Sequence, residues 1–549
     1  MLTFCPYEFI EIDMENLAYE LTFPKGWSWD EVKEKTVVGN EKRKFIVEND
    51  TRRYEHFKNV SKSSHIVLLE NKKKGGKNGF QIFKELIEYN NEKVRMDYVK
   101  KSSNNELGVK EVKKIGYLDE VVEQDNMYGI TGQNDFIYEE DGFEGNESKK
   151  MLYHRQIEQC DTFVDEHDNI IMYAIPCCPK CHNRLPIGWK QAEDFGAVSL
   201  MAPSGTGKTT FLCSMMNRDW HAFQNLSYGG IGRINITAAH LMNDEADATY
   251  AAMKKQAEGM CKTGGQCIQS TDTEHWIPPI FLNVQYEGHT CIIGIYDNSG
   301  ENLRIMDLIK NPNLRMLLNK MFAEIYLFDP RWLNISLPKE RKREIWEKFE
   351  ECKILSLKEQ GEYQVKHAGK NIDAKELLQR QNVKVNGGYK PIDAMEVYRS
   401  HLSSMQQNNY LWRLKEMYFL GVIIKSDLLE DIEEIRSRGE YDLLFDRDIS
   451  DDMLDLNSME IRSELVQEMI HELRLFGNED IDKFKEDFGE IDANGNLTGK
   501  KAVSWHCISA QGCGATENGT LAGEYAPIRV AEPMVTCIVK FLIDKGWIK

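Results

Sequence analysis

Hydrophobic and polar positions divide the chain into an N-terminal part without a clear period and a C-terminal part with a regular one. From Phe195 onward, short apolar runs alternate with helix-like segments, which is typical of an α/β sheet. A helix is predicted over 533–546, where it would pack on that sheet. The apolar runs that predict strands are 195–202, 277–286, 291–296, 323–329, 419–424 and 502–508. We therefore expect a sheet flanked by helices over residues 190–549.

The pattern before this region predicts a mixed α+β region over residues 1–175. Strand-like runs occur at 44–47 and 65–69, and a short amphipathic helix is predicted over 80–89. A cysteine-containing segment at 176–189 separates this region from the sheet.

Two charged segments within the C-terminal region read as helical insertions, at about 330–409 and about 428–496. The second contains a helix-like stretch at 458–476, and a further helix is predicted over 238–256. Solvated helices are the simplest interpretation of these insertions, and a docking surface for a protein partner is the alternative.

The turn after the first predicted strand has the sequence Ala202-Pro-Ser-Gly-Thr-Gly-Lys-Thr209. It fits the phosphate-binding loop G-x-x-x-x-G-K-[ST], except that alanine stands at the first glycine position. Gly205 and Gly207 allow backbone N–H groups to turn inward around a phosphate. Lys208 can reach the β- and γ-phosphates, the Thr209 hydroxyl can ligate Mg²⁺, and the following helix points its positive end at the same anion.

Three further polar elements follow predicted strands: Asp297-Asn-Ser-Gly-Glu301, Lys425-Ser-Asp427 and Ser509-Ala-Gln511. An acidic residue at a strand end can hold Mg²⁺ through water, and a glycine three residues later can offer its N–H to a γ-phosphate. In this order and on these strand ends, the four elements resemble those of the Ras-like class of GTPases over roughly residues 190–549.

A narrower resemblance rests on C-P-Y near the start, C-P-x-C-H before the sheet and the D-N-S-G-E element. These look like the bacterial paired "double-GTPase" proteins, which are encoded together in predicted conflict, or anti-phage, systems. The resemblance implies a Ras-like P-loop NTPase sheet, GTP and GDP as ligands, and a protein partner, with a second GTPase as one candidate.

The resemblance also implies how the base is selected. The Asp427 carboxylate would accept hydrogen bonds from the guanine N1–H and 2-amino group, while the Lys425 stem lies along the base and the backbone after Ser509 contacts O6. Adenine would leave that carboxylate unpaired. Ile424 stands where the family has asparagine or threonine. The implied nucleotide-binding residues are Ser204, Gly205, Thr206, Gly207, Lys208, Thr209, Thr210, Lys425, Asp427, Ser509 and Ala510.

Magnesium would be held by Thr209 and, through water, by Asp297. A first-switch threonine, either Thr271 or Thr273, would complete the site, and we take Thr273 as the working assignment.

Hydrolysis would depend on Lys208, Gly300 and Glu301. Gly300 would sense the γ-phosphate. Glu301 stands where many GTPases have the glutamine that orients the attacking water, and its carboxylate repels the γ-phosphate. We therefore expect slow hydrolysis that a partner stimulates by supplying an arginine.

The segment Cys177-Cys-Pro-Lys-Cys-His182 contains half of a typical zinc knuckle, because two thiolates spaced C-x-x-C bind one tetrahedral ion. A second half of similar form, Cys5-Pro-Tyr-Glu8, lies at the N-terminus. We predict a structural zinc site that ties the N-terminus to the entrance of the sheet. A knuckle without metal is the alternative. The predicted ligands are Cys5, Glu8, Cys178 and Cys181, with Cys177, His182 and Cys160 as other candidates.

Composition limits the ligands and the cellular location that we expect for the protein. The formal net charge of −19 over 549 residues argues against broad binding to nucleic acids or anionic membranes. The sequence contains no apolar run of about 18 residues, so we expect no membrane span. The N-terminus does not resemble a signal peptide. Thirteen cysteines beside a nucleotide loop favour reduced thiols and a cytoplasmic location.

Two other functions remain open at this point. The chain could be an ATPase of another P-loop class that uses Asp297 as its acidic magnesium ligand and Glu301 to activate water. It could also be a nucleotide-stabilised scaffold that binds a partner without hydrolysis.

Overall fold

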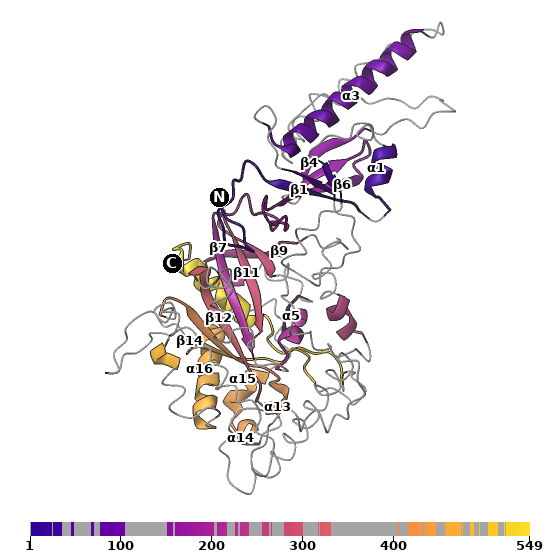
Figure 1. Cartoon of the computed structure of the whole chain (residues 1–549). Helices are drawn as coiled ribbons and strands as arrows, with labels where there is room; N and C mark the ends of the chain where they lie inside the picture. Colours follow the sequence, from indigo (N-terminus) through magenta and orange to yellow (C-terminus); the bar gives the residue numbers. More distant parts are fainter. Residues whose placement is uncertain are drawn as a thin grey trace, which may run out of the picture.

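The computed structural model has the α/β character that the sequence predicts: a mixed sheet with helices, preceded by a second sheet (Figure 1). The structure describes residues 2–24, 26–35, 46–48, 67–70, 77–104, 151–157, 160–202, 206–216, 226–228, 231–240, 255–262, 265, 279–299, 317, 319–330, 403, 406, 415–430, 433–445, 456–473, 475, 484–487, 494, 503–513, 521 and 523–548.

The larger sheet has eight strands in the order β14-β13-β12-β7-β11-β10-β9-β8. The first five are parallel to their neighbours, and β10, β9 and β8 pair antiparallel. The carboxyl ends of the five parallel strands therefore meet at one edge of the sheet, where ligands bind in open α/β sheets. The strands are β7 (Asp194–Ala202), β8 (Leu226–Tyr228), β9 (Ile231–Ala238), β10 (Ile280–Tyr286), β11 (His289–Ser299), β12 (Met321–Phe328), β13 (Tyr418–Ile423) and β14 (Val503–Cys507).

Strand β7 lies in the middle of this sheet and is buried on both faces. Phe195, Ala197 and Met201 belong to one hydrophobic cluster, whereas Val198 and Leu200 belong to the other. Side chains alternate between the faces of a strand, so a run that is apolar at nearly every position fits a parallel strand covered on both sides.

The turn between β10 and β11 follows from its two residues. Glu287 and Gly288 both have positive φ, 46° and 88°. This is the backbone of the tight two-residue hairpin turn whose twist matches the flanking strands. It fixes the register that pairs Tyr286 with His289.

Helices cover both faces of the eight-stranded sheet. Helix α5 (Lys208–Met216) follows β7, and α18 (Glu532–Asp544) packs against β12 and β13. Helix α16 (Leu456–Glu472) covers the outer strand β14, where the Trp505 N–H donates to the Ser463 hydroxyl at 2.9 Å. The donor is the backbone N–H of Trp505, which an edge strand without a covering helix would leave exposed.

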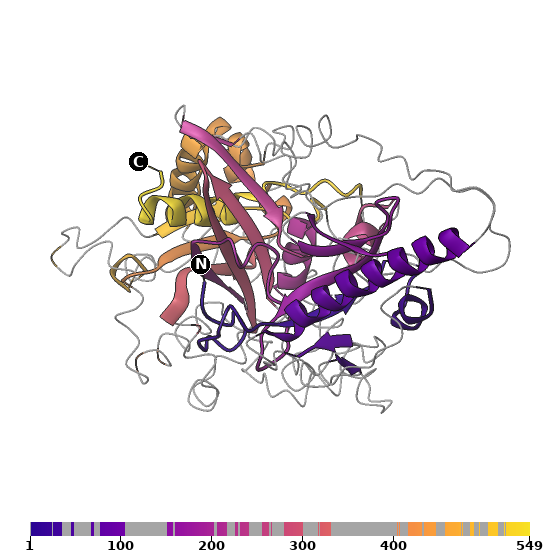
Figure 2. The ribbon, with the colours of Figure 1, turned by 90° about the horizontal axis from the view of Figure 1, so that it is seen from above.

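The smaller sheet is antiparallel, with the order β2-β3-β1-β6-β5-β4. Its strands are β1 (Ala18–Thr22), β2 (Ile46–Glu48), β3 (Val67–Leu69), β4 (Tyr153–Ile157), β5 (Cys160–Val164) and β6 (Ile170–Cys177). Helix α1 (Trp29–Lys35) and the long α3 (Gly79–Asn104) accompany it, and both views show α3 running beside the sheet and away from the larger one (Figures 1 and 2).

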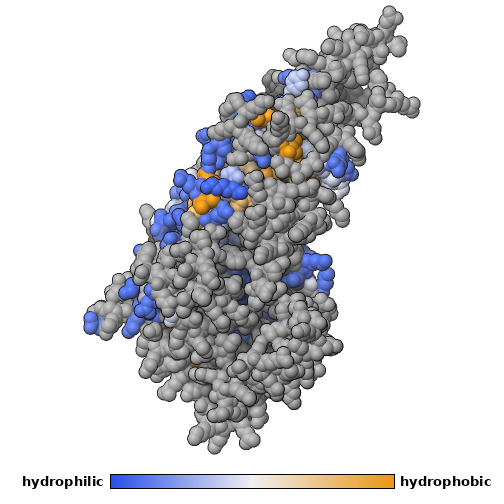
Figure 3. Space-filling model, viewed as in Figure 1, coloured by the Kyte–Doolittle hydropathy of each residue, from blue (hydrophilic) through white to orange (hydrophobic). Residues whose placement is uncertain are grey.

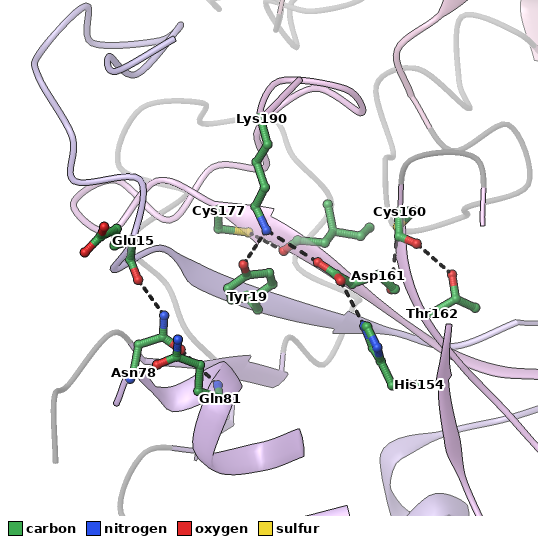
Figure 4. A network of polar contacts seen from close by, with 11 residues as sticks. Glu15, Tyr19, Asn78, Gln81, His154, Cys160, Asp161, Thr162, Cys177 and Lys190 are labelled. Carbon is green, nitrogen blue, oxygen red and sulfur yellow. Dashed lines mark hydrogen bonds and ion pairs between the residues drawn. The ribbon is translucent and has the colours of Figure 1, made fainter. Parts of the chain in front are cut away.

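A polar network ties the smaller sheet to the segment that leads into β7 (Figure 4). The Lys190 ammonium donates to the Tyr19 hydroxyl at 2.5 Å and lies 3.4 Å from an Asp161 carboxylate oxygen. His154 binds the other Asp161 oxygen at 2.9 Å. Burial raises the pKa of Asp161, but the contacts with His154 and Lys190 outweigh it and leave that pKa lowered. The network therefore holds a carboxylate that joins two strands to Lys190.

The N-terminal segment packs on the face of the larger sheet that carries Phe195. The rings of Phe4 and Trp189 each lie 5.3–5.4 Å from Phe195. The Tyr296 hydroxyl donates to the Pro6 carbonyl at 2.7 Å. The two sheets consequently share one hydrophobic cluster.

On the face shown in Figure 3, the described residues at the surface are mostly hydrophilic, and hydrophobic side chains form only small spots in the upper half of the view. None of the described helices is long and apolar enough to cross a membrane.

Several predicted elements differ in extent. The helix predicted over 80–89 continues to Asn104. The β8–β9 hairpin was not predicted, and the start of the helix predicted over 238–256 was wrong, because Ala238 ends β9. Residues 241–254 of that helix lie outside the described residues, and 255–260 are helical. The insertion at 330–409 lies almost wholly outside the described residues, whereas the second contains α13 (Asp427–Glu430), α14 (Glu433–Arg436), α15 (Asp442–Phe445) and α16.

Candidate nucleotide site and metal centre

The described part of the phosphate loop lies at the carboxyl edge of the larger sheet, between β7 and α5. Gly207 has φ +105°, a conformation that favours glycine. The Lys208 ammonium lies 2.7 Å from an Asp297 carboxylate oxygen, and both side chains are largely buried. Parallel pairing of β11 with β7 sets Asp297 opposite Leu200. The structure thus brings together the cation of one sequence element and the carboxylate of another.

Lys425, at the end of β13, lies beside the same loop. A Cβ placed on Gly207 would be 3.7 Å from the Lys425 Cε and 3.4 Å from the Ile424 Cδ1. The Lys425 ammonium is 2.7 Å from a carboxylate oxygen of Asp329, which follows β12 and is 1% exposed. The stem of this lysine therefore runs along the glycine of the loop, and its charged end is paired.

Asp427 is held by the loop that follows β14. The Ser509 hydroxyl donates to an Asp427 carboxylate oxygen at 2.5 Å and accepts from the Gly512 N–H at 2.9 Å. The Ser509 N–H donates to the Ile528 carbonyl at 3.0 Å. Ser509 thus orients the carboxylate with its side chain, and its own N–H is already engaged.

The remaining predicted residues divide into two groups. Thr206 is buried, and Thr209 and Thr210 are half-buried in or just after the loop; Ala510 follows Ser509 at the same sheet edge. The predicted residues that lie outside the described part of the chain are Ser204, Gly205, Thr271, Thr273, Gly300 and Glu301.

Asp329 was missed as a site residue. Its signal in the sequence is a carboxylate directly after a run that is apolar except for Glu324, just as Asp297 follows the apolar run 291–296. A single acidic residue at a strand end indicates no partner in the sequence. Lys425 reaches Asp329 because β12 and β13 are neighbouring parallel strands.

A separate cluster joins the two cysteine segments. The ligand atoms of Cys5, Glu8, Cys178 and Cys181 all lie within 4.8 Å of one another, and this cluster could hold a metal ion. The Cys5 and Cys181 sulfurs are 3.7 Å apart. The cysteines are buried and Glu8 is half-buried. Cys177, His182 and Cys160, the other candidates, are outside this cluster.

The two halves of the cluster have the same backbone shape. In the first, the Phe9 N–H donates to the Cys5 carbonyl at 2.7 Å; in the second, the His182 N–H donates to the Cys178 carbonyl at 2.9 Å. Phe9 and His182 both have positive φ, 55° and 58°. Each C-P segment thus forms one tight turn that aims its ligand side chains at the other.

The thiols of this cluster influence one another. Hydrogen bonds from Cys181 and Cys5 lower the pKa of Cys178 to about 3. Burial raises the pKa of Cys5 well above its usual range. One thiolate is therefore held among neutral thiols.

Comparison with known protein families finds no family that matches the chain, and a search of curated proteins finds no match either.

Proposed function

We propose that the protein is a GTP-binding switch that hydrolyses GTP to GDP slowly. One observation carries the proposal: the phosphate-loop Lys208, the Asp297 carboxylate and the paired Asp427 and Ser509 all lie at the carboxyl ends of parallel strands in one sheet. The strand order β14-β13-β12-β7-β11-β10, with β10 antiparallel, supports a Ras-like arrangement. A cytoplasmic location, a role in bacterial defence and a protein partner belong to the same proposal.

In this proposal each described residue has a defined task. The N-terminus of α5 and the Lys208 ammonium bind the phosphates, because backbone N–H groups and a cation there favour an anion. The Asp427 carboxylate accepts from the guanine N1–H and 2-amino group. Water attacks the γ-phosphate in line, and the protein contributes positioning and charge stabilisation.

The residues at the loop suit a magnesium ion. Mg²⁺ prefers hard oxygen ligands, and the Thr209 hydroxyl and Asp297 carboxylate are of that kind. The ion would neutralise charge that develops on the phosphates. Because Lys208 contacts Asp297 in this structure, phosphate binding would draw the ammonium away and leave the carboxylate for the ion.

Asp427→Asn tests guanine selection. The amide can no longer accept from both guanine donors, so we expect GTP affinity to fall by about tenfold to a hundredfold, from hydrogen bonds to a charged group worth about 1.5–3 kcal/mol. ATP affinity should change little. Competition between labelled GTP and ATP, with Mg²⁺ present, measures both.

The control is Asp442→Asn, at an exposed position on α15, which should leave both affinities unchanged. If wild-type protein binds ATP as well as GTP, and Asp427→Asn alters neither, the protein is a P-loop ATPase of another class. Preferential GTP binding without turnover, even with a cognate partner, would favour the non-hydrolysing scaffold.

We also propose that the cysteine cluster binds a structural Zn²⁺. Three cysteine thiols, which release their remaining protons when a metal binds, and one carboxylate match the ligands and the tetrahedral coordination of closed zinc sites. The ion would join the N-terminal segment to the entrance of β7, because Cys5 and Cys181 lie 176 residues apart in sequence.

Removal of this metal should destabilise the protein. A ligand that binds only the folded state at a concentration of 100 times its Kd stabilises by about 2.7 kcal/mol. We therefore expect a strong chelator to lower the Tm, and one equivalent of Zn²⁺ to restore it. Metal analysis of Cys178→Ser should show loss of zinc, whereas Cys213→Ser, a buried thiol on α5, should retain it. Equal zinc content in both variants would contradict the assignment.

A further inference from the structure

The ion pair between Lys425 and Asp329 determines which part of the lysine side chain can contact a nucleotide base. The two atoms are 2.7 Å apart, and the Asp329 side chain is fully buried, whereas the Lys425 side chain is 31% exposed. Of the two side chains, only that of Lys425 is accessible to a ligand. A buried carboxylate is costly unless it is paired, so this contact restrains the ammonium strongly.

The backbone of Lys425 supports the same arrangement. Its φ is +55°, an uncommon conformation for a residue with a side chain. The Ile424 N–H donates to the Phe328 carbonyl at 3.0 Å, which joins the end of β13 to the residue before Asp329. The lysine Cε then passes 3.7 Å from the Cβ position of Gly207. Strand ends, turn and ion pair together fix both ends of the side chain.

This arrangement has a chemical consequence. An unpaired lysine beside a phosphate loop would turn its ammonium toward the phosphates. With the ammonium held by Asp329, Lys425 offers only its methylene stem, which is a flat apolar contact suited to the face of a purine ring.

We propose that Asp329 is a positioning residue that determines base selection by holding Lys425 as an apolar platform under the base. The inference rests on the proposed function, since it assumes that a nucleotide base lies next to Lys425. It assigns to the end of β12 a role that none of the sequence elements indicated.

Asp329→Asn is the test, with labelled GTP, ATP and Mg²⁺-tripolyphosphate as probes. We expect GTP affinity to fall by about tenfold, because a lysine stem that is no longer held lets guanine move out of the plane in which it meets the Asp427 carboxylate. ATP makes no such hydrogen bonds to that carboxylate, so its affinity should change less and the preference for GTP over ATP should fall. Tripolyphosphate, which contacts only the loop, should bind within about twofold of wild type, which separates positioning from a general loss of structure.

Asp194→Asn is the matched control. Asp194 also pairs with a lysine, Lys545, at 2.5 Å, but lies at the opposite end of β7 and is about one-third exposed. The Asp194→Asn variant should bind all three probes as the wild-type protein does. If Asp329→Asn does not fold, Asp329→Glu keeps a buried carboxylate for the Lys425 ammonium but displaces it, and the same loss of GTP preference is expected.

The outcomes separate the two proposals. Wild-type GTP preference in either folded Asp329 variant, or an equal loss of GTP and tripolyphosphate binding, overturns the role of Asp329. Absence of a GTP preference in the wild-type protein overturns the proposed function instead.

Discussion

Lys208→Ala is expected to reduce GTP affinity by two to four powers of ten. The ammonium is the only charged group of the described loop residues 206–210, and it would bond oxygens of two phosphates. Charge-assisted hydrogen bonds are worth about 1.5–3 kcal/mol each, and about 1.4 kcal/mol corresponds to a factor of ten. Equilibrium binding of labelled GTP with Mg²⁺ measures the loss. Binding as tight as that of the wild-type protein would refute the assignment of the phosphate loop.

Two controls separate this effect from damage to the fold. Lys208→Ala removes the partner of the Asp297 carboxylate, which is only 6% exposed, so it should also lower the Tm. Lys208→Ala with Asp297→Asn removes that unpaired charge and should recover most of the Tm without recovering GTP binding. Lys545→Ala breaks the ion pair with Asp194 at the other end of the sheet and should leave GTP affinity unchanged.

The parts of the fold that followed from the sequence are those set by local pattern. The runs 195–202 and 419–424 are apolar at almost every position, the run 323–328 is apolar except for Glu324, and each forms a buried parallel strand. The register of such strands then carries polar residues at their ends to one edge. For this reason the proximity of Lys208 and Asp297 could be anticipated before either was placed.

The two halves of the cysteine cluster could also be paired from the sequence, although they are far apart in it. Metal ligation requires particular side chains at a particular spacing, and C-P-x-x occurs in both segments. The structure places all four predicted ligand atoms within 4.8 Å of one another. The identity of a bound ion stays a prediction.

Other features depended on contacts that local pattern does not contain. The hairpin of β8 and β9 has a three-residue strand on the outer edge, too short to show a period. Helix α3 continues through Asn90, Asn91 and a run of charged residues, which favour helix ends or loops when judged alone. Lys425 and Asp329 are 96 residues apart, with the first insertion between them.

A buried charged cluster beneath α18 is the clearest feature of this kind. Glu532, in the first turn of α18, is 2% exposed and pairs with Arg462 of α16. Arg529 lies 3.0 Å from the same carboxylate oxygen, and His506 of β14 lies 3.7 Å from the other. Burial raises the pKa of Glu532, but the contacts with His506 and the two arginines outweigh it, so its pKa is lowered.

Glu532→Gln is expected to destabilise the protein by about 3–5 kcal/mol at neutral pH, because it leaves two buried guanidinium groups without their counter-charge. A carboxylate with a lowered folded pKa stabilises above its unfolded pKa, near 4.3, and loses that contribution as the pH falls through the folded value. The amide does not titrate. The difference in urea-unfolding midpoint between wild type and variant should therefore be large at pH 7 and shrink below about pH 4.

Glu460→Gln, an exposed position on α16, makes the same change of charge outside the cluster and should shift neither the midpoint nor its pH dependence. A Glu532→Gln midpoint within the scatter of this control would mean that the arginines are satisfied without the carboxylate.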